Sequence, residues 1–369
     1  MQNVRFVFST NYISFVRLQV CPNVIFLALS VAYGLPLSES SCIVGGFLTL
    51  LVGCAAMPFI EWEWALLVVA FVMGLATAMT QGTLFSICGV CGPRHTAALT
   101  VGTGMAGTVI CFIRMATKSA PSKRLSVDVF FGFSAAFCVI CVLMYRVVVK
   151  ESRFYSAQRS LAKGSDSTIE SEDRSEALEA PLVERVADDD EDDEKTPQAE
   201  LPTLEMIRKL RIAILSVVLV FLVTLAIFPG IVSEMESNRI SSDWWSLILF
   251  TIFNATDTIG KSLPAYYQPL DLRGLLLGAC VRLAFIPLCI ICVTPNVISW
   301  DVAQGLLIAV FGLSNGFLGT VAMMLGPEEF NDASKNKAGL IMVFFLTSGL
   351  AVGSWVGVGL KQLMDHTSL

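Results

Sequence analysis

Long apolar runs separated by short polar segments recur along most of the chain. Each run holds about 20 mostly apolar residues, the length that a helix rising about 1.5 Å per residue needs to cross a hydrocarbon core about 30 Å thick. Ten runs predict ten spanning helices, at 12–35, 41–60, 64–88, 98–118, 127–149, 209–232, 243–263, 273–294, 300–325 and 337–360. The pattern therefore predicts an all-α, polytopic membrane protein.

One break between the runs differs from the others. From Glu151 to about Leu204, Ser, Glu and Asp replace the apolar residues, and 188–194 is an unbroken acidic run. Such a segment cannot bury enough apolar surface to offset the entropy lost on ordering, so we expect a disordered loop. The sequence thus predicts an N-terminal helical half at 1–150, an acidic loop at 151–205 and a C-terminal helical half at 206–369.

Composition and charge agree with this division. The 369 residues are 54% hydrophobic and 15% charged, and the mean hydropathy is +0.69, values that exclude an ordinary soluble globular domain. More than half of the 31 acidic residues lie in the loop, so the net charge of −6 describes that loop and indicates little about a ligand.

Basic residues near the helix ends predict the orientation. Lys and Arg gather on the cytoplasmic side of membrane proteins. Both flanks of the acidic loop are basic, so we expect the loop to be cytoplasmic: Arg146, Lys150 and Arg153 precede it, and Arg208, Lys209 and Arg211 follow it. Five spans on each side of the loop then place both termini outside. We expect a first helix to be missing from the N-terminal half.

Two charged residues stand inside one apolar run. Asp257 and Lys261 lie four positions apart in "FNATDTIGKSL". A charge at the bilayer centre costs a few kcal/mol, so such residues normally have a partner and face a protein interior or a water-filled path. Residues four positions apart share one helix face, and Asn254 joins that face. Two interpretations stay open: a neutralised pair that fixes helix packing, or a pair that lines a substrate path.

A second polar feature is Gln81, on a run that continues into the glycine-rich "GTGMAG". Small residues let membrane helices approach each other closely. An amide carries two donor hydrogens and two acceptor lone pairs, which suits recognition of a neutral polar ligand. The same side chain serves equally well in an interhelical hydrogen bond, so both interpretations of Gln81 stay open.

These residues lie in three blocks that resemble the equilibrative nucleoside transporter family. The first contains Gln81, Phe85 and "GTGMAG", and is similar to the family's fourth helix and the loop into its fifth. The second, "FPGIVSE" followed by "FTIFNATDTIGKSL", resembles the end of the seventh helix and the eighth-helix signature Asn-x-x-Asp-x-x-Gly-Arg. The third, "GLSNGFLGTVAMMLGPEEFNDASKNKAGLIMVFFLTSGLAVGS", resembles the last two helices. The blocks follow the family's order over nearly the whole chain.

The resemblance implies an eleven-helix bundle related to the major facilitator architecture, with six helices before a cytoplasmic loop and five after it. The ten expected spans match helices two to eleven, so the family's first helix, which lines the substrate site, is the one we expect to be missing. The resemblance also implies alternating access, in which one half rocks against the other around a site near the midplane.

The resemblance further assigns residues to a substrate site. It places Gln81 at the nucleobase, Asp257 near the ribose, Asn254 and Phe250 on the cavity side of the same helix, and Phe228 just before Pro229. Lys261 stands where the signature has an arginine. This substitution keeps the charge and loses the planar fork of donors, so we expect Lys261 to contact the ribose or Asp257 without a bidentate geometry.

We therefore expect facilitated diffusion of nucleosides, with nucleobases as a further substrate class. Two alternatives are a proton-coupled nucleoside transporter, with Asp257 as the titrating group, and a truncated relative that does not transport. A membrane enzyme is disfavoured because no Ser, His and Asp set or metal cluster is apparent at membrane depth. We expect no cofactor, no metal and no nucleic-acid polymer as partner, contact with the lipid bilayer, and a location in the plasma membrane. The oligomeric state is not predicted.

Overall fold

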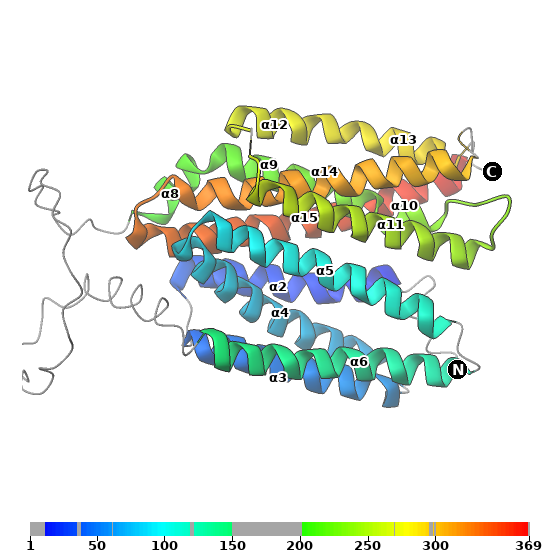
Figure 1. Cartoon of the computed structure of the whole chain (residues 1–369), viewed down its shortest axis with the longest axis horizontal. Helices are drawn as coiled ribbons and strands as arrows, with labels where there is room; N and C mark the ends of the chain where they lie inside the picture. Colours follow the sequence, from blue (N-terminus) through cyan, green and yellow to red (C-terminus); the bar gives the residue numbers. More distant parts are fainter. Residues whose placement is uncertain are drawn as a thin grey trace, which may run out of the picture.

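The structure of the chain is a computed structural model that describes residues 12–34, 38–60, 62–118, 122–149, 201–268, 270–294, 298 and 300–367. Every regular element among these residues is a helix, and the long helices run side by side in one elongated bundle (Figure 1). The acidic loop predicted at 151–205 lies outside the described residues up to position 200. The division into two halves and a loop therefore stays a prediction.

The helices before the predicted loop form one group in the bundle. Short helical turns follow two of them, η1 (Met57–Phe59) and η2 (Tyr145–Val149). The long members are α2 (Tyr12–Tyr33), α3 (Glu39–Ala56), α4 (Glu63–Cys91), α5 (Pro93–Lys118) and α6 (Lys123–Met144). In this group α4 packs against both α2 and α3, and α6 packs against α3.

The helices after the predicted loop form the second group. One span among them is composite, because the 3-10 turn η4 (Arg282–Ala284) interrupts it between α12 (Leu272–Val281) and α13 (Phe285–Ile291). The other elements are α8 (Thr203–Lys209), α9 (Arg211–Ile227), α10 (Gly230–Ser233), α11 (Ser242–Ser262), η3 (Leu263–Ala265), α14 (Asp301–Glu328) and α15 (Asp332–Thr367). The main packing partners are α9 with α15 and α11 with α14.

Local signals in the sequence explain several helix boundaries. Gly92 ends α4 with a φ of 101°, in the left-handed region that favours glycine, and Pro93 starts α5 where its missing N–H costs nothing. The side chain of Asp271 accepts a hydrogen bond from the Gly274 N–H at 2.8 Å and caps α12. Ser122 caps α6 in the same way, by accepting from the Leu125 N–H at 3.1 Å.

Eight helices among the described residues are long and apolar enough to cross a membrane, and they match eight of the ten predicted spans. Of the other two, the run at 12–35 forms α2, whose apolar part is counted as the shorter helix Val20–Tyr33. The run at 243–263 forms α11, a 21-residue helix that carries Asp243, Asp257 and Lys261. These charges make α11 less apolar, yet it lies packed between α5 and α14. The predicted all-α, multi-pass architecture is confirmed.

The two groups of helices meet along two seams. On one seam α5 lies beside α11, and on the other α15 lies beside α2 and α4. Glycines permit the close approach on both: a Cβ on Gly107 would collide with the side chain of Asn254, and a Cβ on Gly339 would lie 2.5 Å from the Phe85 carbonyl oxygen. Helices α4, α5, α11 and α15 therefore set the relative position of the two groups.

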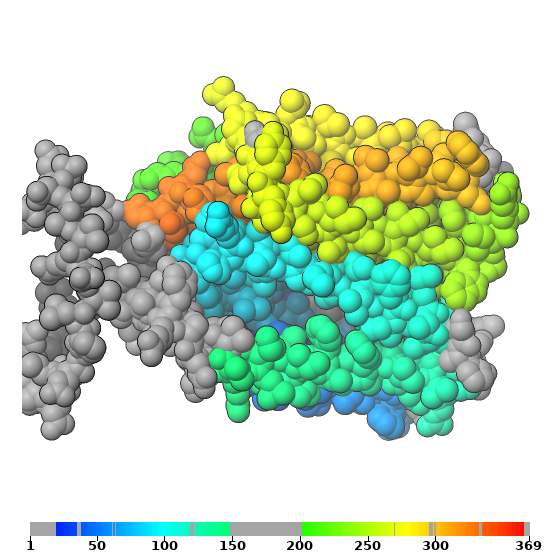
Figure 2. All heavy atoms as spheres, in the orientation of Figure 1, coloured from blue at the N-terminus to red at the C-terminus, as the bar shows by residue number. Residues whose placement is uncertain are grey.

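Apolar side chains cover the outside of the bundle. Helix α6 has no buried residue in its most apolar 18-residue window, and large side chains such as Phe133, Phe137 and Leu143 are exposed on it. Helix α6 lies on the face that Figure 2 shows, beside α5. Exposing these apolar side chains to water would cost free energy, whereas in a bilayer they face lipid chains that are equally apolar.

Candidate functional site

Helix α11 brings Asp257 and Lys261 into direct contact. The Nζ of Lys261 lies 2.7 Å from Oδ2 of Asp257, and the two side chains are 13% and 5% exposed. The i, i+4 spacing predicts this contact, and the structure confirms it as a buried ion pair. The only other i, i+4 ion pair among the described residues, Glu205 with Lys209, is about half exposed and longer, at 3.9 Å.

The second oxygen of Asp257 binds a residue of another helix. Nδ2 of Asn315, on α14, donates to Oδ1 of Asp257 at 2.7 Å. On its other side, Oδ1 of Asn315 accepts from the hydroxyl of Thr224, on α9, at 2.6 Å. Asn315 and Thr224 are both buried. Helices α9, α11 and α14 are thus joined by side-chain hydrogen bonds that end on the carboxylate.

Arg282 is the third charged residue of this cluster. It lies in η4 near the middle of its span and is 1% exposed. Its guanidinium donates to the Phe311 carbonyl at 2.9 Å, to the Thr224 hydroxyl at 3.0 Å and, at 3.5 Å, to Oδ1 of Asn315, and it also bonds the Ser314 hydroxyl. We call Asp257, Lys261, Arg282, Asn315 and Thr224 the polar cluster. With one carboxylate and two cations, it carries a formal charge of +1.

Close helix packing holds the polar cluster together. A Cβ on Gly316 would collide with the carbonyl oxygen of Asp257 and would lie 2.7 Å from the backbone nitrogen of Lys261. Only a glycine permits α11 and α14 to approach this closely at that point. The neighbouring residue, Asn315, thereby comes within hydrogen-bonding distance of Asp257.

Phenylalanine rings lie beside the polar cluster. Phe228, which ends α9, lies 4.9 Å from the ring of Phe250 and 4.3 Å from that of Phe253. Phe253 continues to Phe311 at 5.4 Å, and the guanidinium of Arg282 lies 4.8 Å from the centre of the Phe311 ring. The structure thus brings Phe228 and Phe250 into contact and links them to Arg282 through two further rings.

Asn254 and Lys261 both reach the seam between α5 and α11. The Asn254 amide donates to the Phe250 carbonyl at 2.8 Å and lies 3.5 Å from the sulfur of Cys111, on α5. The Nζ of Lys261 donates to the hydroxyl of Thr103, also on α5, at 3.3 Å. Part of the predicted site therefore faces the helices of the other group.

Gln81 is not connected to the polar cluster. It lies half-buried on α4, and no hydrogen bond joins its amide to another described residue. Five of the six predicted site residues, Phe228, Phe250, Asn254, Asp257 and Lys261, come from the end of α9 and from α11. The role of Gln81 at a nucleobase stays a prediction.

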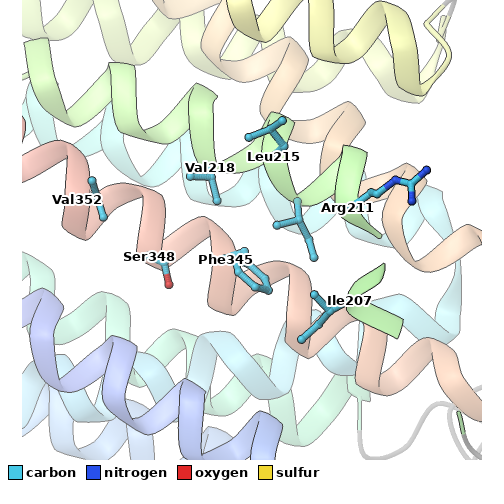
Figure 3. A pocket seen from close by; sticks show the side chains of 8 residues that line it. Ile207, Arg211, Leu215, Val218, Phe345, Ser348 and Val352 are labelled. Carbon is cyan, nitrogen blue, oxygen red and sulfur yellow. The ribbon is translucent and has the colours of Figure 1, made fainter. Parts of the chain in front are cut away.

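An open groove lies elsewhere, between α8, α9 and α15 (Figure 3). Its volume is about 550 Å³, and its lining is almost wholly apolar. The lining residues are Ile207, Arg211, Ile214, Leu215, Val218, Phe345, Ser348 and Val352, none of which is a predicted substrate residue. An open apolar groove offers few groups to orient a polar ligand, so we place the functional site at the polar cluster.

Three members of the polar cluster are not among the residues predicted from the sequence: Arg282, Asn315 and Thr224. Arg282 falls inside the predicted span 273–294, so the rule that identifies Asp257 as a buried charge applies to it equally. Asn315 lies in "GLSNG", where it is a polar residue inside another apolar run. No spacing in the sequence indicates that these residues converge on Asp257.

The side chains of the polar cluster are suited to hydrogen bonds with a polar ligand. A carboxylate accepts hydrogen bonds from hydroxyl groups, and an ammonium with three hydrogens donates to them. The ammonium of Lys261 uses two of its donors on Asp257 and Thr103. One donor therefore remains for a hydroxyl of a polar ligand that enters the seam.

Known proteins share extended sequence similarity with this chain. The sequence profile of the nucleoside transporter family matches residues 67–361. Equilibrative nucleotide transporter 1 of Arabidopsis thaliana is 28% identical over 290 residues, which cover 76% of this chain and 60% of that protein. Equilibrative nucleoside transporter 1 of Rattus norvegicus is 28% identical over 311 residues, which cover 78% of this chain and 66% of that protein. The chain thus spans about two thirds or less of these two relatives.

The bundle also resembles solved transporter structures. The proton:xylose symporter XylE, of the major facilitator superfamily, aligns with a TM-score of 0.57 at 11% identity, over 97% of this chain and 78% of XylE. At that identity the likeness shows the fold alone, and it confirms the predicted major-facilitator-like bundle. Because the family profile covers most of the sequence, including every residue of the polar cluster, the chain is a member of the nucleoside transporter family.

Proposed function

We propose that the chain carries nucleosides across a membrane by facilitated diffusion. The observation that carries this proposal is the buried pair of Asp257 and Lys261. The pair lies on α11, a predicted span of this nucleoside transporter family member, and reaches the seam between the two helix groups. A buried ion pair is expensive to place in a membrane, so a role at a polar substrate accounts for it better than packing alone.

Each predicted site residue has a role in this proposal. Asp257 accepts hydrogen bonds from the ribose hydroxyls, and Lys261 donates to them. Phe228 and Phe250 provide apolar contacts for the sugar and base, since a nucleoside presents flat faces as well as polar edges. Gln81, whose amide has no other partner among the described residues, reads the polar edge of the nucleobase. Asn254 fixes the spacing of α5 and α11 beside the ligand.

Transport follows from movement of one helix group against the other. The seams between α5 and α11 and between α15 and α4 open in alternation, so that the site faces one side of the membrane at a time. We expect the protein to act in the plasma membrane, and nucleobases to be a further substrate class. No cofactor is needed, because the substrate gradient supplies the driving force.

Purified protein in liposomes tests the proposal. We expect saturable uptake of labelled adenosine and uridine that stops when the inside and outside concentrations are equal. An inward proton gradient separates the two modes of transport: equilibration with or without the gradient supports facilitated diffusion, whereas accumulation above equality only with the gradient shows proton coupling. No uptake, from protein that is folded and correctly inserted, contradicts the proposal.

A further inference from the structure

Arg282 is a buried cation without a carboxylate of its own. No salt bridge among the described residues includes it, and its side chain is 1% exposed near the middle of a span. A buried charge in the membrane costs a few kcal/mol unless other groups compensate it. The groups around Arg282 are the Phe311 carbonyl, the hydroxyls of Ser314 and Thr224, and the amide of Asn315.

Hydrogen-bonding chemistry fixes the direction in which Asn315 points. A guanidinium can only donate, so the amide oxygen of Asn315 must face Arg282. An ionised carboxylate can only accept, so the amide nitrogen must face Asp257. The structure has this arrangement, with the oxygen 3.5 Å from Arg282 and the nitrogen 2.7 Å from Asp257. The dipole of the Asn315 amide is thus aligned between the guanidinium of Arg282 and the carboxylate of Asp257.

Asp257 is consequently held from two sides. Asn315 occupies its Oδ1 and Lys261 its Oδ2. Lys261 also contacts Thr103 across the seam, whereas Arg282 and Asn315 are buried and bond residues within the second group of helices. If Lys261 turns toward a ligand, Asp257 still has a donor and a nearby cation, and the buried carboxylate is not left uncompensated.

We propose that Arg282 is a positioning residue for the substrate site, which holds Asp257 through Asn315 and Thr224 and so frees Lys261 to bind the substrate. The inference rests on the proposed function, because it assigns the substrate contact to Asp257 and Lys261. Arg282 itself touches no substrate. Its effect is on the position of Asp257, and therefore on substrate affinity.

Uptake kinetics of Arg282→Gln test the inference. We expect the KM for adenosine to rise about tenfold while the maximal rate per surface molecule changes less than about twofold, because binding is weakened and movement is not. The matched control is Arg273→Gln, at an exposed arginine on α12, which we expect to leave KM unchanged. A residue that only stabilises the fold would lower the amount of protein at the surface and leave KM as it is.

Two further variants keep the test decisive if Arg282→Gln does not fold. Thr224→Val removes one hydroxyl of the cluster and keeps the size of the side chain, and we expect it to raise KM about threefold. Arg282→Lys keeps the charge and loses the fork, so its KM should fall between those of the wild type and Arg282→Gln. An unchanged KM in Thr224→Val, or in Arg282→Gln if that variant folds, overturns the inference.

Thermal unfolding separates this inference from the proposed function. In purified protein, we expect Arg282→Gln to lower the midpoint temperature less in an Asp257→Asn background than in the wild type, because the two residues are coupled. Equal decreases in both backgrounds overturn the inference. If the wild type shows no saturable uptake, the proposed function fails, and this thermal cycle still decides whether Arg282 acts through Asp257.

Discussion

At the scale of single residues, the contacts of the polar cluster explain why a lysine, Lys261, can replace the arginine of the family's eighth-helix signature. Asp257 already has one oxygen engaged by Asn315, so a single ammonium contact satisfies the other. A bidentate fork would need both carboxylate oxygens on the same side. Lysine therefore keeps the positive charge that this geometry places beside Asp257 at the seam.

Substitution of Lys261 tests this explanation. We expect Lys261→Met to lower the initial rate of adenosine uptake about tenfold, because it removes the donor and leaves Asp257 with one partner fewer. Lys261→Arg should keep at least about a third of the rate, because it keeps the charge. The control is Lys209→Met, which breaks the half-exposed pair with Glu205 and should have no effect. Equal rates for Lys261→Met and Lys209→Met contradict the explanation.

At the scale of elements, the sequence predicts the helices better than their contacts. The run at 243–263 becomes α11 (Ser242–Ser262), with boundaries within one residue, and the i, i+4 spacing predicts its ion pair correctly. Hydrophobicity averaged over a span conceals a single charge, which is why Arg282 does not emerge from the pattern. The contacts of Asn315 depend on how α9, α11 and α14 pack, which is tertiary information that no spacing within one helix contains.

The packing of α14 against α11 gives the next test. We expect Gly316→Ala to destabilise the protein by about 1–3 kcal/mol and to reduce uptake strongly, because the added methyl group collides with the backbone of α11 and moves Asn315 away from Asp257. The control, Gly305→Ala on the same helix, places its methyl 3.7 Å from Ile252 and should be tolerated. Thermal unfolding and uptake of the two variants are the measurements. Similar behaviour of both would show that this helix contact is unimportant.

At the scale of the whole molecule, the contacts along the two seams are those that the proposed transport cycle has to break and remake. Near the end of α4 and the start of α15, the Ser86 hydroxyl donates to the Asn336 carbonyl at 3.2 Å, and a Cβ on Gly89 would lie 2.7 Å from the Lys335 carbonyl oxygen. These contacts close one end of the bundle between the two helix groups. The proposed alternating access requires them to separate in each cycle.

Cross-linking tests this requirement. We expect a short thiol-reactive cross-linker to stop uptake in a variant with both Ser86→Cys and Asn336→Cys, and a reductant that cleaves the link to restore it, because the link prevents α4 and α15 from separating. The wild type treated in the same way controls for the native cysteines, including Cys88 and Cys91 on α4. Full uptake by verified cross-linked protein would mean that this contact does not open during transport.

The most direct test of the central claim, that Asp257 is at the centre of a nucleoside site, is uptake of labelled adenosine by cells that lack their own carriers. Asp257→Asn keeps the shape of the side chain and removes the charge, and Glu205→Gln makes the matched change in the exposed ion pair. With equal amounts of protein at the surface, we expect Asp257→Asn to reduce saturable uptake at least about tenfold and Glu205→Gln to leave it within about twofold of the wild type. Equal uptake by the two variants would contradict the claim.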